Sequence, residues 1–300
     1  MDYSFPRYLL SKQTVDDRAL NKDVVNKLRL HLPPEPVSVI EVGAGIGTML
    51  KRLIEWKIIC AGEYVLVDAT DENIAYARDW IPQWATESGL SVARNGRDLL
   101  QLCDRTRDIR IRLERADVFD FIEKNETRAD VLIAHAFLDL LPMPQSLEKL
   151  LSLSNGLAWL TINFDGMSTL GPVIDRVLDE KIERLYHRTM DQRSTGGDSR
   201  TGRKLFEHLR SVNAQILAVG ASDWVVYGSN GEYPADERYF LRFILHFFES
   251  SLRNCDELEV SEFAGWLARR HEQVERGELV YIAHQMDFLV RGRPAVEGHT

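Results

Sequence analysis

Glycines at alternate positions separate a strand pattern from a helix pattern near the start of the chain. Residues 37–42 form an apolar run rich in β-branched side chains, which is typical of a short buried strand. Gly43, Gly45 and Gly47 follow directly, and apolar residues with helical spacing come next. Such a turn lets backbone atoms approach a ligand closely, while the helix N-terminus presents unpaired N–H groups. The pattern predicts a site for a nucleotide-like ligand beside the first strand of an α/β sheet.

Strand and helix patterns keep alternating after this turn. Further strands are predicted near residues 64–67, 109–113, 131–134, 157–163, 214–219 and 279–290, and residues 225–227 form a short strand-like run. Helices are predicted near residues 71–80, 173–186, 204–210, 234–252 and 261–277. Alternation at this spacing is typical of βαβ units, which form a parallel sheet covered on both faces. We therefore expect an α/β fold with a doubly wound, mostly parallel sheet of seven strands.

The patterns divide the chain into four parts. An amphipathic helix predicted over residues 14–32, ended by prolines, makes residues 1–36 an N-terminal helical cap. The α/β core is expected to cover residues 37–230. Two helices, one of them rich in aromatic residues, make residues 231–278 a helical insertion, which could be a lid, an interface or ordinary core packing. Residues 279–300 would hold the last strand and a C-terminal tail.

The glycine turn departs from the dinucleotide fingerprint G-x-G-x-x-G, because its sixth position is Thr48. With the acidic residue on the preceding strand, the segment from Glu41 to Gly47 reads E-x-G-x-G-x-G and resembles the first motif of class I S-adenosylmethionine-dependent methyltransferases. The resemblance extends over about residues 37–165. Asp68 ends the second strand, Asp117 follows the third, and residues 129–142 resemble the fourth motif of that family.

The resemblance implies a Rossmann-like fold with S-adenosyl-L-methionine as cofactor and S-adenosyl-L-homocysteine as product. Asp68 would accept hydrogen bonds from both ribose hydroxyls, and Asp117 would accept one from the adenine amine, with Val118 donating its backbone N–H. For Glu41 we expect hydrogen bonds from N–H groups of the turn or, through water, from the cofactor amine. The expected cofactor-binding residues are Glu41, Gly43, Ala44, Gly45, Gly47, Asp68, Ala69, Asp117, Val118 and His135. Taken singly, a strand-ending aspartate is equally well explained as a helix cap or a turn residue.

Candidate substrate-binding and catalytic residues follow the fourth and fifth strands, where ligands of open α/β sheets lie. His135 is a candidate general base, and His187 near a helix end is a second one, although packing and helix capping explain these histidines as well. Asp139 and Asp165 would face the substrate. The loop over residues 188–204 carries five basic and two acidic side chains, and its Arg200 and Arg203 would bind a carboxylate or phosphate unless the loop is simply solvated.

Charge and cysteine content limit the partners. The formal net charge of -9 argues against a nucleic acid or an anionic membrane surface. The three cysteines, at positions 60, 103 and 255, fit neither a disulfide framework nor zinc-ligand spacing, so we expect a reducing, cytoplasmic setting and no metal. The chain has no signal peptide pattern and no apolar run of membrane-spanning length.

These observations predict an S-adenosylmethionine-dependent methyltransferase that acts on a small molecule, which would be anionic if the arginine loop is functional. An NAD(P)-dependent oxidoreductase would share the strand, the glycine turn and Asp68. A protein that binds the cofactor without catalysis, or that methylates a protein, would share every cofactor motif. The sequence is also compatible with a homodimer.

Overall fold

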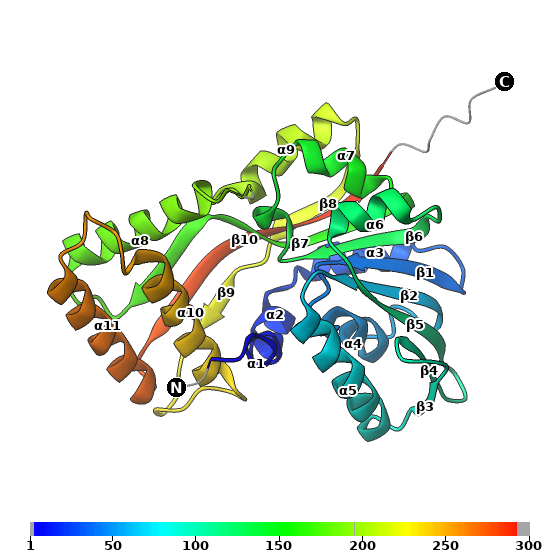
Figure 1. The fold of residues 1–300 in the computed structure, drawn as a ribbon, viewed down its shortest axis with the longest axis horizontal. Helices are drawn as coiled ribbons and strands as arrows, with labels where there is room; N and C mark the ends of the chain where they lie inside the picture. Colours follow the sequence, from blue (N-terminus) through cyan, green and yellow to red (C-terminus); the bar gives the residue numbers. More distant parts are fainter. Residues whose placement is uncertain (1–2, 195, 293–300) are drawn as a thin grey trace.

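The computed structural model describes residues 3–194 and 196–292, which form one sheet with helices on both faces (Figure 1). Its strands are β1 Val37–Val42, β2 Ala61–Asp68, β3 Ser91–Arg94, β4 Leu99–Cys103, β5 Asp108–Arg115, β6 Ala129–His135, β7 Ser154–Gly171, β8 Gln215–Ala221, β9 Trp224–Val226 and β10 Val280–Arg291. Its helices are α1 Phe5–Ser11, α2 Gln13–Ala19, α3 Lys22–His31, α4 Thr48–Glu55, α5 Asp71–Glu87, α6 Val118–Lys124, η1 Leu138–Leu140, α7 Gln145–Leu151, α8 Arg176–Asp191, α9 Thr201–Ser211, α10 Glu237–Leu252 and α11 Val260–Glu275.

The centre of the sheet is parallel and doubly wound, as expected. The strand order is β3-β4-β5-β2-β1-β6-β7-β10-β8, and β5, β2, β1, β6 and β7 run parallel. Side chains of β1 and β6 are buried on both faces because helices cover both, which explains their nearly continuous apolar runs. The carboxyl ends of the parallel strands therefore meet along one edge of the sheet.

Within residues 3–194 and 196–292, the sheet has ten strands rather than the seven expected. Antiparallel β3 and β4 extend one edge beyond β5, and short β9 pairs with β10. The side chains of β3 are mostly exposed, so this strand has no apolar pattern by which it could be recognised. Strand β7 spans 18 residues because it continues past the predicted end at 163 into the polar segment that pairs with the first half of β10.

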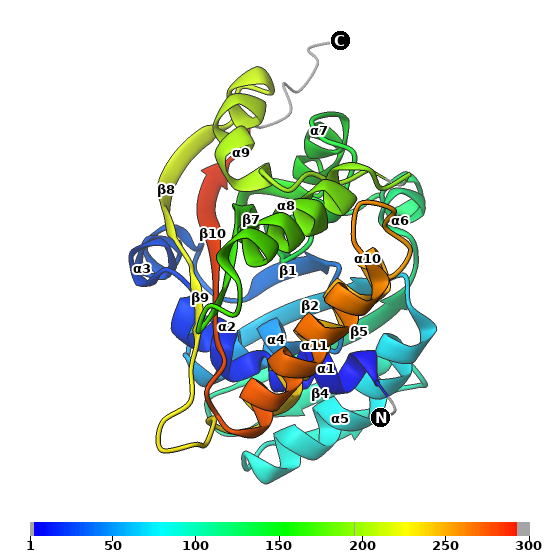
Figure 2. The ribbon, with the colours of Figure 1, turned by 90° about the vertical axis from the view of Figure 1, so that its left-hand side faces the viewer.

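The extension of β7 and β10 carries a second group of helices away from the parallel strands. We call α8, α10 and α11, with the paired ends of β7, β9 and β10, the helical lobe, and the rest of the sheet with its helices the sheet lobe (Figures 1 and 2). The aromatic side chains of α10 form the core of the helical lobe: Phe248 stacks on Tyr186 of α8 with ring centroids 4.0 Å apart, and both Phe240 and Phe248 are fully buried. These rings are thus ordinary core residues.

The N-terminal segment forms three helices where one was predicted over residues 14–32. The helical pattern breaks at Leu20, and the side chain of Asn21 caps α3 by accepting hydrogen bonds from the N–H groups of Asp23 and Val24. Helix α1 packs on α10 of the helical lobe and on α5 of the sheet lobe, so the N-terminal helices connect the two lobes.

Two further expectations concern membrane-spanning helices and the C-terminal tail. No helix within residues 3–194 and 196–292 has both the length and the apolar character needed to cross a membrane. Of the predicted C-terminal tail, residues 293–300 lie outside the described residues.

Candidate functional site

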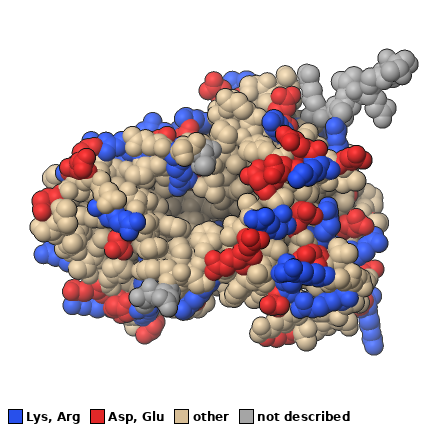
Figure 3. Space-filling view, viewed as in Figure 1, with Lys and Arg blue, Asp and Glu red and all other residues tan. Residues whose placement is uncertain are grey.

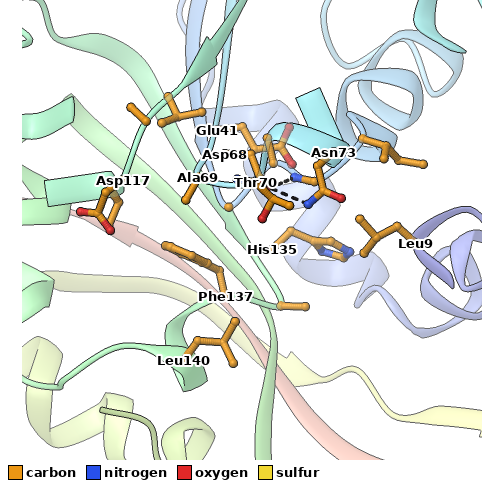
Figure 4. Close-up of a pocket in the computed structure, with 18 of the residues that line it drawn as sticks. Leu9, Glu41, Asp68, Ala69, Thr70, Asn73, Asp117, His135, Phe137 and Leu140 are labelled. Atoms are coloured by element: carbon orange, nitrogen blue, oxygen red, sulfur yellow. Dashed lines mark hydrogen bonds between the residues drawn. The ribbon is translucent and has the colours of Figure 1, made fainter. Parts of the chain in front are cut away.

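A cavity of about 440 Å3 lies at the carboxyl ends of β1, β2, β5 and β6. The molecule is hollowed between its two lobes, as Figure 3 shows, and Figure 4 shows the side chains that line the cavity. Nine of the ten expected cofactor-binding residues line it, namely Glu41, Gly43, Ala44, Gly45, Asp68, Ala69, Asp117, Val118 and His135. The N-terminal cap adds Phe5, Leu9 and Lys12, which motif reasoning did not include. The volume falls within the range typical of small-molecule sites.

Gly47 is not part of the cavity lining, although it was expected to bind the cofactor. It adopts φ of +86° as the N-cap of α4, and a Cβ there would lie 2.7 Å from Leu66 in the core. Gly43 and Gly45, at φ of +62° and +57°, do line the cavity. A Cβ on Gly43 would lie 2.2 Å from the Phe137 ring, so glycine is required there for the turn to pass beneath that ring.

Asp68 lies at the end of β2 and anchors the glycine turn. Its Oδ2 accepts a hydrogen bond from the Gly45 N–H at 2.8 Å, and its Oδ1 accepts from the Thr70 N–H and the Asn73 amide. A carboxylate has about four lone-pair positions, so three donors leave room for one more. The role of Asp68 at both ribose hydroxyls stays a prediction, and three of its acceptor positions are already used within the chain.

Asn73 supplies a second acceptor in the same corner of the cavity. Its Nδ2 donates to Asp68, whereas its Oδ1 is buried without a hydrogen-bond partner among the described residues. A buried acceptor without a donor costs free energy unless a ligand or water satisfies it. Asp68 and Asn73 together can thus accept one hydrogen bond each from a ligand with two adjacent hydroxyls. The position of Asn73 in the first turn of α5, five residues after Asp68, is the signal that could have indicated it.

Glu41 is buried beside this corner and accepts a hydrogen bond from the Tyr64 hydroxyl at 2.8 Å. Turn N–H groups were expected in this role, but Tyr64 pairs with Val39 across β1 and β2 and so lies diagonally opposite Glu41 on the same face of the sheet. Burial raises the pKa of Glu41 to about 8, against the lowering effect of the Tyr64 hydrogen bond. The side chain is therefore mostly protonated at neutral pH and can donate a proton to a hydrogen bond.

Asp117 is both a helix cap and part of the cavity lining. It is the N-cap of α6, where its Oδ1 accepts a hydrogen bond from the Phe119 N–H at 2.8 Å, and it also lines the cavity next to Val118. Its Oδ2 takes no part in the cap, so that oxygen can accept a hydrogen bond from a ligand.

His135 has both ring nitrogens engaged and is not free to act as a base. Its Nε2 lies 3.0 Å from Asp16 Oδ2, and its Nδ1 lies 2.8 Å from the Thr161 hydroxyl. Burial outweighs the attraction of Asp16 and lowers the pKa of His135 to about 4. The ring is therefore neutral near pH 7, with Nε2–H donating to the Asp16 carboxylate and Nδ1 accepting from the Thr161 hydroxyl. His135 thus forms part of the cavity wall as a packed, hydrogen-bonded side chain.

Asp16 is the centre of a fully buried charged cluster under the cavity. Besides His135, it contacts the ammonium of Lys12 and the guanidinium of Arg52, each at 3.3 Å, and the indole N–H of Trp224 at 2.9 Å. Although burial opposes ionisation, Lys12, His135 and Arg52 lower the pKa of Asp16 well below its usual range. The cluster joins α1, α2, α4, β6 and β9, and it holds Lys12 at the cavity wall.

The expected substrate-binding residues are not gathered at this cavity. Arg203 donates to Asp165 through its Nε at 2.8 Å, so these two candidates bind each other. Asp139 lies in η1 with its Oδ1 buried and unpaired among the described residues, and burial raises its pKa. His187 and Arg200 line a separate cleft of about 390 Å3 beside α8. No group of three His, Cys, Asp or Glu side chains that could hold a metal occurs within residues 3–194 and 196–292.

The strand order, the glycine turn and the cavity together have the form of a Rossmann-like α/β fold, and their motifs resemble those of class I methyltransferases. No family model and no curated protein matches the chain. Solved structures with a similar fold include an S-adenosylmethionine-dependent methyltransferase from Thiobacillus denitrificans in complex with S-adenosyl-L-homocysteine, which is 15% identical over 98% of this chain and 100% of that one, with a TM-score of 0.46.

Two other solved structures are similar to about the same degree. Magnesium protoporphyrin IX methyltransferase from Synechocystis PCC 6803, with S-adenosyl-L-homocysteine bound, is 13% identical over 74% of this chain and 82% of that one, with a TM-score of 0.44. A cyclopropane synthase from Mycobacterium tuberculosis is 10% identical over 97% and 95% of the two chains, with a TM-score of 0.46.

Proposed function

We propose that this protein transfers the methyl group of S-adenosyl-L-methionine to a small-molecule acceptor. The observation that carries the proposal is the convergence of the glycine turn, the Asp68 and Asn73 pair, and Asp117 on one cavity at the carboxyl ends of four parallel strands. These residues would suit the hydrogen-bonding groups of an adenosine, and E-x-G-x-G-x-G replaces the dinucleotide fingerprint.

The residues of the cavity fit the parts of this cofactor. Asp68 and Asn73 would each accept a hydrogen bond from one ribose hydroxyl, since each has a free acceptor position. Asp117 Oδ2 would accept from the adenine amine, and the Val118 N–H would donate to the ring. Lys12 is the cationic side chain of the lining and would attract the carboxylate at the other end of the cofactor.

The chemistry of the site is mainly alignment. The cofactor, when bound, supplies a methyl group that its sulfonium already activates. The chain would hold the acceptor atom in line with that methyl group and exclude water, a task for the apolar side chains of Phe137 and Leu140 in the lining. His135 would fix the shape of this wall rather than remove a proton, because its nitrogens are engaged with Asp16 and Thr161. The acceptor atom would thus enter the site as a nucleophile that has already given up its proton to solvent.

The test uses S-adenosyl-L-methionine with a radiolabelled methyl group, added with the purified chain to a cell lysate separated into small-molecule and protein pools. We expect label to appear in the small-molecule pool, and a chain with Gly43→Val, whose side chain would enter the Phe137 ring, to transfer none. Label in the protein pool alone would contradict the acceptor class, and absence of transfer from both pools would favour cofactor binding without catalysis.

A further inference from the structure

A second cleft, which we call the α8 cleft, lies between α8 and the outer half of β7. Its volume is about 390 Å3, and it is lined by Ser168, Glu183, Arg184, His187 and Arg200, among others. Two segments in contact with each other, residues 138–142 and 196–198, lie near both this cleft and the cofactor cavity. Pro142 lines the cofactor cavity and lies against Gly196, and the Asp198 N–H donates to the Asp139 carbonyl, while Arg200 two residues later lines the cleft.

The acidic side chains of the α8 cleft are already engaged. Asp191 accepts hydrogen bonds from the N–H and the hydroxyl of Ser199, and Glu180 is paired with Arg176 at 3.0 Å. Burial raises the pKa of Glu183 to about 7, and this side chain also accepts from the Leu170 N–H. Near neutral pH, Glu183 is therefore partly protonated, and the charge of Glu180 is balanced by Arg176.

Two of the three arginines of the cleft keep their charge available. Arg188 is paired with Glu257, whereas neither Arg184 nor Arg200 forms an ion pair with any residue in the ranges 3–194 and 196–292. The Arg200 side chain lies over Gly166, where a Cβ would come within 3.1 Å of its Cγ, so this glycine lets the arginine reach across the cleft. Arg203 differs, because Asp165 occupies its guanidinium.

The cleft also has a neutral hydrogen-bond donor. Ser168, which is buried, and His187 share a hydrogen bond of 2.6 Å between Oγ and Nε2. If the serine hydroxyl donates, the imidazole keeps its Nδ1–H; if the imidazole donates, the serine keeps its O–H. In both tautomers, the pair has one donor left beside the unpaired arginine.

We propose that the α8 cleft binds an anionic group of the methyl acceptor, a carboxylate or a phosphate, through Arg200 and the Ser168–His187 pair. A planar guanidinium next to a neutral donor suits both groups, which accept several hydrogen bonds through oxygen. The acceptor would extend over residues 138–142 and 196–198, with its anionic group in the α8 cleft and its nucleophilic atom at the cofactor cavity. The inference rests on the proposed function for the identity of the ligand, but the anion site can be tested without the cofactor.

The test follows the His187 ring by long-range 1H–15N correlation spectra of the full chain, assigned with a His187→Gln sample. Inorganic phosphate and, separately, acetate are titrated at constant ionic strength and pH 7.5. We expect at least one of them to shift the His187 resonances saturably, and Arg200→Gln to weaken that anion's apparent affinity about tenfold, as loss of one charged hydrogen bond predicts. Which of the two binds identifies the group.

The matched control is Arg210→Gln, which removes the same charge from an exposed position of α9 outside the cleft lining. It should leave the titration unchanged. An absent response to both anions, or an equal response in Arg200→Gln, would overturn the inference. Titration of S-adenosyl-L-homocysteine on the same samples separates the two proposals: we expect wild type and Arg200→Gln to bind it equally, and failure of wild type to bind it would contradict the proposed function instead.

Discussion

Replacing Asp16 by alanine is expected to lower the free energy of unfolding by about 3–5 kcal/mol, because it leaves two buried cations without their shared partner. The Asp16 side chain is fully buried, and those of Lys12 and Arg52 are 6% and 1% exposed. Urea unfolding at pH 7, followed by tryptophan fluorescence, measures the effect.

Asp17→Ala is the matched control for this variant. The Asp17 carboxylate pairs with the same Arg52 from a position that is 34% exposed, so its loss should cost about 1 kcal/mol or less. Because the pKa of Asp16 is lowered in the folded chain, its contribution is complete above the unfolded-state pKa of about 4 and decreases as the pH falls below it. Equal destabilisation by the two substitutions, or a loss of the Asp16 contribution on raising the pH, would contradict the stabilising role of Asp16 in the buried cluster.

Replacing Asp68 by asparagine is expected to weaken the binding of S-adenosyl-L-homocysteine roughly 10- to 100-fold, the loss typical of a hydrogen bond to a charged group. The asparagine would present an N–H group to one of the donors that now bind the carboxylate, from Gly45, Thr70 and Asn73. The ribose contact and the position of the glycine turn would change together. Calorimetric titration measures the affinity, and circular dichroism checks that the variant is folded.

Asp71→Asn provides the comparison for Asp68→Asn. It removes the same charge three residues later, at an exposed side chain in the first turn of α5 that points away from the cavity lining and pairs with Arg115. Its affinity for S-adenosyl-L-homocysteine should stay within about twofold of wild type, since exposed ion pairs contribute little. Similar losses in both variants would mean that general charge, rather than the Asp68 contact, governs binding.

Sequence patterns predicted the parallel half of the fold well because its strands are buried on both faces. The run at residues 37–42 coincides with β1, and the glycine turn lies where the pattern put it. Strand β3 and the outer half of β7 were missed because exposed and polar side chains on paired strands leave no apolar alternation. The break between α2 and α3 at Leu20 was missed because apolar spacing continues across it.

The residues of the candidate site that could be predicted are those whose role follows from their position at the end of a single strand. Asp68, Asp117 and the glycines follow strand ends, which a sequence displays directly. The partners of His135 could not be predicted, since Asp16 is 119 residues away and reaches it only through tertiary packing. For the same reason, the pairing of Asp165 with Arg203, which leaves Arg200 as the available arginine, has no local signal.

Calorimetric titration of the wild-type chain with S-adenosyl-L-methionine, S-adenosyl-L-homocysteine, NAD+ and NADH tests the central claim most directly. We expect micromolar binding of both sulfur compounds with one site per chain, and no saturable heat from either dinucleotide. Saturable binding of a dinucleotide without binding of the sulfur compounds would contradict it and assign the cavity to an oxidoreductase.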